Sequence, residues 1–296
     1  MRFSPALVSG VLATAAKALQ SGSSSSDSDD WTNNSTKPIE LVPAPWALHG
    51  TVYSLATLLP PATLPAKAYG PLERASPAYV GAAEYVGLLG MIQIIRYTDS
   101  PVGPYDELLL VPGYFKYPHI DAEGRQTERL NPSITRIYVS QKYTAKNGRL
   151  NWNIPKHLAK FDWTESADGS TTVKVYPFDT AGAGPTRRAS PAPRPCPFPN
   201  DLHARPGGLP FSTDLAHGEL AGTDRWRAVV PGQASARSSL GLFDMDQGRG
   251  DQVGDTGRNA VGDEFFPNFW PNTPRLTLGL RMDNAKISFG EPEIWG

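Results

Sequence analysis

Residues 91–97 read MIQIIRY, an apolar and β-branched run that contains three isoleucines. Runs of this composition are typical of strands. A second apolar run, ELLLV at residues 107–111, is bounded by the turn-forming pairs Gly103-Pro104 and Pro112-Gly113. Each of the two runs predicts a strand.

Two more strand patterns follow toward the C-terminus. Residues 134–140 read ITRIYVS, and their branched and aromatic side chains predict a strand that is buried on at least one face. Arg136 lies at the centre of this strand and points either to the interior or to solvent, since the pattern allows both. Residues 172–176, TVKVY, alternate between polar and apolar positions and predict a strand with one exposed face.

The last strand-like segments and the segment after Pro155 predict a hairpin and a helical turn. Residues 276–282 and 285–289 both alternate, and the turn-like Asp283-Asn284 between them predicts a hairpin. Helix is scarce elsewhere. Pro155 favours one short helical turn over residues 156–161, because a missing N–H costs nothing at the first helical position.

The fold class follows from these patterns. The 28 glycines and 29 prolines indicate many turns, and residues 179–218 and 246–263 read as long loops. Many short strands with few helices predict a mainly β fold: an antiparallel, closed or partly closed β-barrel with few short helices and long loops. Such a barrel offers an apolar cavity to a small ligand.

Composition excludes several classes of protein. The 28 Lys and Arg nearly balance the 29 Asp and Glu, so the charge does not favour nucleic-acid binding. Cys196 is the single cysteine, which excludes an internal disulfide and a cysteine-rich metal site. The remaining candidates for metal ligands lack ligand spacing, so we expect no metal site; they are His49, His119, His203, His217, Asp251, Asp255 and Asp263.

The N-terminal segment is expected to be a separate extension. Residues 21–36 are rich in Ser, Asp and Asn and cannot bury enough apolar surface to fold, so we predict a disordered extension over residues 1–40 and a folded domain over 41–296. Residues 3–16 loosely resemble a secretory signal, and they are too short and interrupted to span a membrane. A cytoplasmic protein with a dispensable extension is favoured over a secreted one.

Two segments carry a resemblance to a known family. The first is SPVGPYDE at residues 100–107, and the second is GRLNWNIPKH at residues 148–157. Their Ser, Gly, Tyr and Glu positions, and their Gly-Arg followed after five residues by Pro-Lys, resemble the signatures of the acetoacetate decarboxylase family, a lyase superfamily with a β-barrel-like fold. The chain most resembles uncharacterised fungal members, also in GTDRW at residues 222–226.

The resemblance implies roles for individual residues. It makes Lys156 the amine that forms a Schiff base with a carbonyl substrate, and Glu107 a group that orients this lysine or shuttles protons. His157 would tune the lysine, and Tyr105 and Trp46 would contact the substrate, Trp46 at a position where the family has an arginine. For Arg149 two roles stay open, substrate binding and hydrogen bonding to loop carbonyls, and the second is favoured.

Lysine chemistry explains why the family needs such a site. The pKa of an ordinary lysine is ~10.4, so only about one amine in 2,500 is free to attack at neutral pH. Burial or a nearby cation disfavours the ammonium, and acetoacetate decarboxylase is itself a known example of this activation. No cofactor is expected, because the protonated imine itself withdraws electrons from the adjacent carbon.

The chain also departs from the family pattern. His157 replaces the second lysine of true decarboxylases, and Leu150 replaces a glutamate that follows Gly-Arg. An acidic pocket residue of the family falls near Ile92 or Gln93. A pocket that lacks a cation and an acid is less suited to a small β-keto carboxylate than to a larger, less charged carbonyl compound.

Two functions are therefore expected as alternatives. The first is a cofactor-independent Schiff-base lyase of the decarboxylase, aldolase or dehydratase type, acting on a small-to-medium carbonyl or keto-acid compound. The second is a barrel that binds an apolar small molecule without turnover, since a fold alone does not establish a function. The expected partner is a small molecule, with no nucleic acid and no membrane, and the resemblance implies association into homo-oligomers.

Overall fold

The computed structural model describes residues 33, 35–59, 64, 68–70, 73, 83–177, 194–195, 226–244 and 276–295. The chain divides into two compact units, Met1–Ser35 and Thr36–Gly296, and the second contains every described helix and strand. The predicted domain boundary at residue 40 stays a prediction. Other predictions lie outside the described residues: the signal-like segment, Cys196, His203, His217, residues 222–225, loop 246–263 and most of loop 179–218.

Twelve strands form one sheet. Its main path runs β8-β7-β6-β3-β2-β1-β13-β12-β9, with β11 beside β13 and the β4–β5 hairpin attached to β2. Neighbouring strands are antiparallel except for the parallel pair β6–β7. The strands are β1 (Trp46–Leu59), β2 (Glu84–Asp99), β3 (Tyr105–Val111), β4 (Tyr114–Ile120), β5 (Gln126–Pro132), β6 (Arg136–Val139), β7 (Lys156–Glu165), β8 (Thr171–Pro177), β9 (Arg194–Pro195), β11 (Gly232–Ala234), β12 (Arg237–Asp244) and β13 (Leu276–Phe289); β10 (Trp226–Ala228) and β14 (Glu293–Trp295) form a separate pair.

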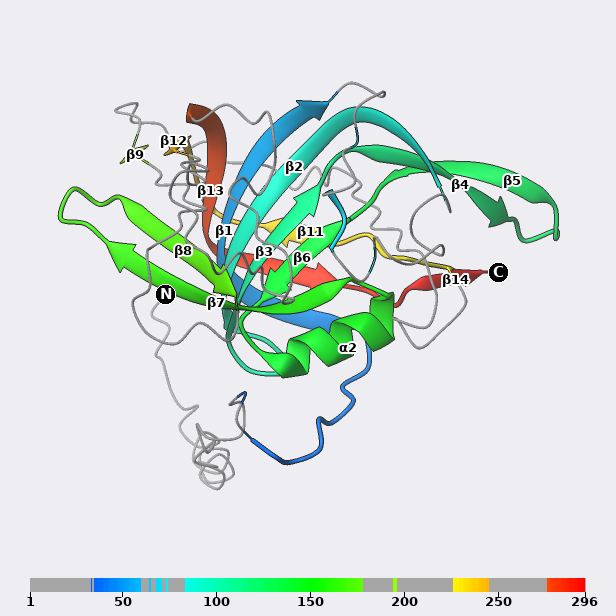
Figure 1. The fold of residues 1–296 in the computed structure, drawn as a ribbon, viewed down its shortest axis with the longest axis horizontal. Coiled ribbons are helices and arrows are strands. Elements are labelled where there is room, and N and C mark those ends of the chain that lie inside the picture. The colour runs from blue at the N-terminus through cyan, green and yellow to red at the C-terminus, as the bar shows by residue number, and fades with distance from the viewer. Residues whose placement is uncertain are drawn as a thin grey trace, which may run out of the picture. The chain divides into compact units, whose positions relative to one another are not determined.

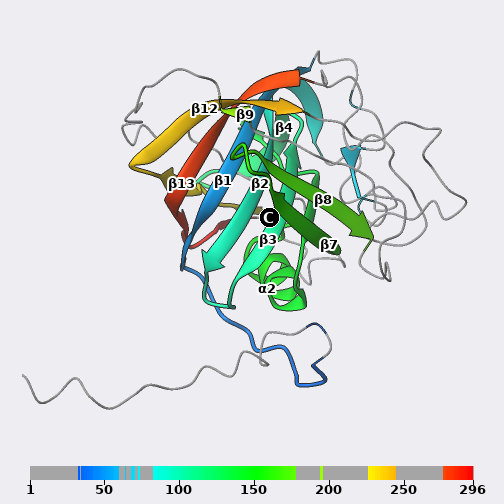
Figure 2. The same cartoon turned by 90° about the vertical axis from the view of Figure 1, so that its left-hand side faces the viewer.

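The sheet is strongly curled but open. Its path ends at β8 and at β9, and no hydrogen-bonded pairing joins these two strands in the described part of the chain. Figure 1 shows the long, bent strands β1, β2 and β13. Figure 2 shows β12 and β8 toward opposite ends of the sheet. The mainly β prediction is confirmed. The prediction of a closed barrel is wrong, because closure requires the two end strands of the sheet to pair with each other.

The predicted C-terminal hairpin is also wrong. Residues 276–289 form the single strand β13, which pairs with β1 on both sides of Asp283-Asn284. The register between β1 and β13 shifts between Gly50 and Val52. Asp283 and Asn284 both lie opposite the single residue Thr51, so they form a bulge and not a turn. Asn284 accepts the left-handed conformation that the bulge requires, with φ of 49°.

The helix lies before Lys156 and not after it. Helix α2 spans Lys142–Trp152, and its N-terminus is capped by the side chain of Gln141. Asn153 ends the helix in a left-handed conformation with φ of 57°. The helical turn predicted over residues 156–161 is wrong, because the backbone of Lys156 pairs with Ile137 of β6 and begins strand β7.

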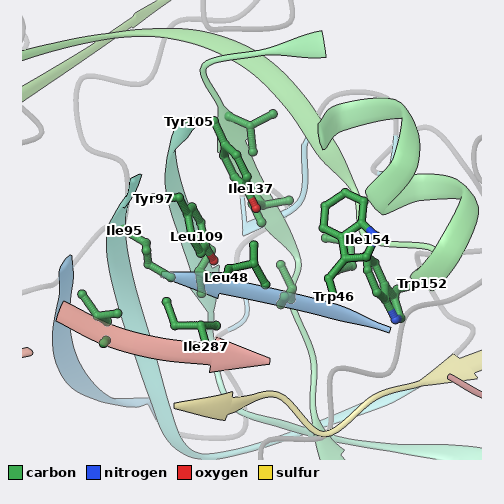
Figure 3. Close-up of a cluster of buried hydrophobic side chains, with 14 of the residues drawn as sticks. Trp46, Leu48, Ile95, Tyr97, Tyr105, Leu109, Ile137, Trp152, Ile154 and Ile287 are labelled. Carbon is green, nitrogen blue, oxygen red and sulfur yellow. The ribbon is translucent and has the colours of Figure 1, made fainter. Parts of the chain in front are cut away.

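Hydrophobic side chains are buried on both faces of the sheet, in two separate clusters. One face, called here the Tyr97 face, carries Tyr97 and Ile137 and packs against Trp152 of α2. The opposite face, called the Tyr138 face, carries Tyr138 and Ile94 and packs against side chains of the β7–β8 hairpin. Figure 3 shows the Tyr97 face with α2 beside it. The side chains of consecutive residues in a strand therefore lie in different hydrophobic clusters.

Trp152 anchors α2, and its removal should destabilise the whole domain. Its ring meets Trp46 edge-on at 5.1 Å and Phe289 at 5.4 Å, and its indole N–H donates to the carbonyl of Gly290 at 2.9 Å. We expect Trp152→Ala to lower the free energy of unfolding by about 3–5 kcal/mol in urea denaturation. Leu130→Ala is the control, because Leu130 is 46% exposed, and a loss of similar size there would contradict a specific role for Trp152.

Candidate active site

The first motif forms the turn that leads into β3. The N–H of Gly103 donates to the carbonyl of Ser100 at 3.0 Å, and Gly103 has φ of 82°, which glycine adopts without strain. The amide of Gln141 donates to the carbonyls of Val102 at 2.8 Å and Pro104 at 3.2 Å. Because Gln141 also caps α2, the first motif is bound directly to the start of the helix.

The second motif is the end of that helix and the return of the chain. The N–H groups of Asn153 and Ile154 donate to the carbonyls of Arg149 and Gly148, at 3.0 and 3.2 Å, and the chain reverses direction there. Lys156 then lies under the last turn of α2. A Cβ atom on Gly148 would come within 2.7 Å of Cδ of Lys156, so the lysine side chain occupies the space that a larger residue would fill.

Lys156 and Glu107 form a buried ion pair on the Tyr97 face. Nζ of Lys156 lies 2.9 Å from Oε2 of Glu107, and their side chains are 5% and 2% exposed. Nζ also donates to Oγ1 of Thr144 at 2.9 Å and lies 5.1 Å from the ring centroid of Tyr105. The two motifs thus bring a lysine amine, a carboxylate, a hydroxyl and an aromatic face together.

Two stacked phenols complete this cluster. Tyr97 and Tyr105 lie with ring centroids 4.4 Å apart, and the hydroxyl of Tyr97 donates to Oε1 of Glu107 at 3.2 Å. Burial, and then the charge of Glu107, raises the pKa of both phenols well above the ordinary value. Both phenols are therefore neutral at physiological pH, and Tyr97 is a hydrogen-bond donor to Glu107.

His157 lies on the opposite face from Lys156. Successive side chains of a strand point to opposite sides, and the His157 ring faces Tyr138 at 6.5 Å. Its Nε2 lies 2.6 Å from Oε2 of Glu73, a fully buried carboxylate (0% exposed). Burial lowers the pKa of His157 despite this partner. At neutral pH the ring is therefore uncharged and donates its Nε2 proton to Glu73.

Arg149 joins the same cluster from the end of α2. Its Nε donates to the main-chain carbonyl of Lys156 at 2.8 Å, and its NH2 donates to Oε1 of Glu73 at 3.0 Å. Burial alone would raise the pKa of Glu73, but the hydrogen bond from His157 and the charge of Arg149 lower it overall. Glu73 is therefore ionised at neutral pH.

The predicted site residues thus fall into three places. Lys156, Glu107 and Tyr105 meet on the Tyr97 face. His157 and Arg149 meet Glu73 on the Tyr138 side of β7. Trp46 lies in the core, where its indole N–H donates to the carbonyls of Val42 and Pro43, both at 3.1 Å. The predicted roles of these six residues stay predictions.

Sequence reasoning missed three residues of these clusters. Thr144 lies one helical turn before Gly148, and this i, i+4 spacing would have placed both on one helix face had the helix been expected. Tyr97 ends the MIQIIRY run and pairs with Tyr105, which required the strand register. Glu73 follows β1 in a segment without a periodic pattern, and no sequence signal indicated it.

Other features of the described residues add no second candidate. No group of three or more His, Cys, Asp or Glu side chains is placed to hold a metal ion within these residues. A groove of about 520 Å³ lies on the β4–β5 hairpin, and none of its lining residues belongs to either of the two motifs. No described helix is long and apolar enough to cross a membrane.

The curled open sheet, with one helix packed beside a buried lysine, defines an acetoacetate decarboxylase-like fold. The domain is similar to acetoacetate decarboxylase from Legionella pneumophila subsp. pneumophila str. Philadelphia 1, with a TM-score of 0.52 and 12% identity over 89% of this chain and 93% of that chain. A second acetoacetate decarboxylase structure gives a TM-score of 0.51 and 12% identity over 86% and 91% of the two chains. The predicted superfamily resemblance is confirmed at the level of the fold.

Sequence comparison reaches less far. No protein-family model matches the chain. The Protein NEOXANTHIN-DEFICIENT 1 of Oryza sativa subsp. japonica is 30% identical over 122 residues, which are 41% of this chain and 35% of that protein. The matched part therefore spans about a third of the length of this curated relative. The predicted fungal type stays a prediction.

The buried His157–Glu73 pair predicts that acid destabilises the fold. The pKa of His157 is lowered from 6.5 on folding, so the unfolded chain binds more protons between the folded value and 6.5, and stability falls as the pH falls through this range. The lowered pKa of Glu73 adds a further loss below 4.5. We expect the calorimetric melting temperature to fall between about pH 7.5 and about pH 5. His157→Gln should reduce this fall, and an equal pH dependence in both proteins would contradict the assignment.

Proposed function

We propose that this protein is a cofactor-independent Schiff-base lyase that acts on a carbonyl compound through Lys156. The observation that carries the proposal is the buried amine of Lys156, 2.9 Å from the carboxylate of Glu107 and 5.1 Å from the ring centroid of Tyr105. The fold shared with acetoacetate decarboxylases supports it.

Glu107 is the base that frees the amine. Burial disfavours separate charges, and transfer of one proton from the Lys156 ammonium to Glu107 turns the ion pair into a neutral pair without changing the net charge of the site. The neutral amine then attacks the substrate carbonyl carbon and forms a C–N bond. The protonated Glu107 supplies the proton with which the carbinolamine oxygen leaves as water.

The iminium then serves as the electron sink. In a β-keto acid, the bond to the carboxylate carbon breaks, its electron pair moves toward the iminium nitrogen, and carbon dioxide leaves. In aldol or dehydration chemistry, a proton is lost from the carbon next to the iminium instead. Protonation of the resulting enamine and hydrolysis by water release the product and restore Lys156.

The substrate we propose is larger and less charged than a small β-keto carboxylate. Gln93, near which an acidic residue of the family falls, is buried and uncharged, and its amide donates to Gln233 at 3.2 Å and to Ser54 at 3.3 Å. Trp46, near which a family arginine falls, is packed in the core. Neither side chain offers a charge to a substrate carboxylate.

The same ion pair also supports a second candidate function, a binding protein without turnover. A carboxylate at 2.9 Å stabilises the ammonium form of Lys156, and an ammonium cannot attack a carbonyl. In this alternative the curled-sheet domain binds an apolar small molecule and Lys156 remains a structural ion-pair partner. Covalent trapping distinguishes the two functions.

Borohydride trapping tests the proposal directly. We expect sodium borohydride and a panel of keto acids, methyl ketones and aldehydes to yield a reduced adduct on Lys156, identified by intact mass and peptide mapping. Lys156→Met is the control, because methionine keeps the apolar stem and removes the amine. Absence of any adduct on Lys156 across the panel would favour the binding function.

Glu107→Gln should separate imine formation from turnover. The amide removes the charge of the ion-pair partner, so we expect an adduct on Lys156 still to form at neutral pH, but more slowly, because the proton donor for loss of water from the carbinolamine is absent. Turnover of the trapped substrate should fall by about 10²–10⁴-fold, because the proton donor and acceptor is lost. Turnover within threefold of wild type, measured by product release, would exclude Glu107 as the proton shuttle.

A further inference from the structure

A buried carboxylate behind the lysine strand has no part in the proposed chemistry. Glu73 is 0% exposed, and its two oxygens are contacted by His157 at 2.6 Å and Arg149 at 3.0 Å. Gly70 leaves room for this contact, since a Cβ atom there would come within 2.5 Å of Oε2 of Glu73. The segment before it is also fixed, because buried Arg136 donates to the carbonyl of Tyr69 at 2.7 Å.

One guanidinium links this carboxylate to Lys156. Nε of Arg149 donates to the carbonyl of Lys156 at 2.8 Å, while NH2 of the same group donates to Glu73. Gly148, the preceding residue, packs on the Lys156 side chain. The last turn of α2 therefore holds Lys156 by its main chain and by its side chain at once.

We propose that Glu73 is a positioning residue that acts through Arg149 to fix the Lys156 amine beside Glu107. The inference rests on the Schiff-base function proposed above. The carboxylate orients the planar guanidinium, and the guanidinium fixes the first carbonyl of β7. Without the charge of Glu73, the guanidinium of Arg149 loses this ionic contact, and the start of β7 is held less firmly relative to Glu107 of β3.

The energetics of buried charge favour positioning over stability alone. Buried ion pairs contribute little net stability, because the desolvation of two charges offsets most of their attraction. A cluster of Glu73, Arg149 and His157 behind a reactive residue is better explained by the geometry that it imposes. Displacement of a reacting group by about 1 Å can lower a rate by about 10²-fold.

Trapping kinetics of Glu73→Gln test the proposal. With a carbonyl compound that traps the wild type, we expect the rate constant at saturation to fall about tenfold and the half-saturating concentration to stay unchanged. A merely structural role would lower the fraction of molecules that react and leave the rate constant of the others unchanged. That second outcome would overturn the proposal.

The double variant Glu73→Gln/Arg149→Lys tests whether Glu73 acts on Lys156 through Arg149. Lysine keeps a charge but cannot hold the carboxylate and the carbonyl through one planar group. If both residues act through one contact to Lys156, the double variant loses no more than the larger single loss. If the rate losses of the two single variants multiply in the double variant, Glu73 does not act through Arg149. Glu123→Gln is the matched control, because Glu123 meets Arg125 at the same 3.0 Å on an exposed surface.

A second measurement separates this proposal from the Schiff-base function. Competitive acetylation of Lys156 by acetic anhydride, followed over pH by peptide mass, requires no carbonyl substrate. In Glu73→Gln we expect the rate of acetylation of Lys156 at a fixed pH to rise, because an amine displaced from Glu107 loses the ion-pair contact that occupies it. An unchanged acetylation rate would overturn the positioning role, whereas failure of every carbonyl compound to trap the wild type would overturn only the Schiff-base function.

Discussion

The alternation of side chains along β7 decides what each residue of the second motif can contact. Lys156 enters the Tyr97 face with Glu107, and His157 enters the Tyr138 face with Glu73. The two side chains are neighbours in sequence, but the sheet lies between them. The side chain at position 157 therefore does not lie beside the amine of Lys156, whose Nζ instead contacts Glu107 and Thr144.

The end of α2 explains the spacing of the same motif. Five residues separate Arg149 from Pro155, enough for the last helical turn and the left-handed Asn153 that reverses the chain. Lys156 then returns beneath Gly148, where only a residue without a side chain leaves room. Arg149 points past this contact to the carbonyl of Lys156. The five-residue spacing, the glycine at position 148 and the arginine at position 149 therefore all follow from the packing of the end of α2 on β7.

Local patterns predicted the strands but not their partners. The apolar runs at residues 91–97 and 107–111 became adjacent strands β2 and β3, as their composition indicated. The hairpin at Asp283-Asn284 failed because a continuous partner, β1, outweighs the local turn preference of two residues. The helical turn after Pro155 failed for a similar reason, since pairing with β6 determined the conformation there. Propensity is local, whereas strand pairing depends on residues that lie 19 positions away for Ile137 and Lys156 and 235 positions away for Gly50 and Ala285.

The candidate site shows the same division. Lys156, Glu107 and Tyr105 could be placed together because two motifs resembled one family, whereas Tyr97 required the register of β2 and β3. Glu73 could not be found, because its partners are fixed by folding and not by spacing.

The charge balance of the Tyr97 face constrains the chemistry further. Glu107 and Lys156 together carry no net charge, and a substrate carboxylate would bring a second negative charge close to Glu107. Like charges at short range in a buried site are unfavourable, so the Tyr97 face accommodates a neutral ketone at a lower cost than a keto acid. Glu107 therefore disfavours a second negative charge on this face, and His157, which pairs with Glu73 on the other face, takes no direct part in this balance.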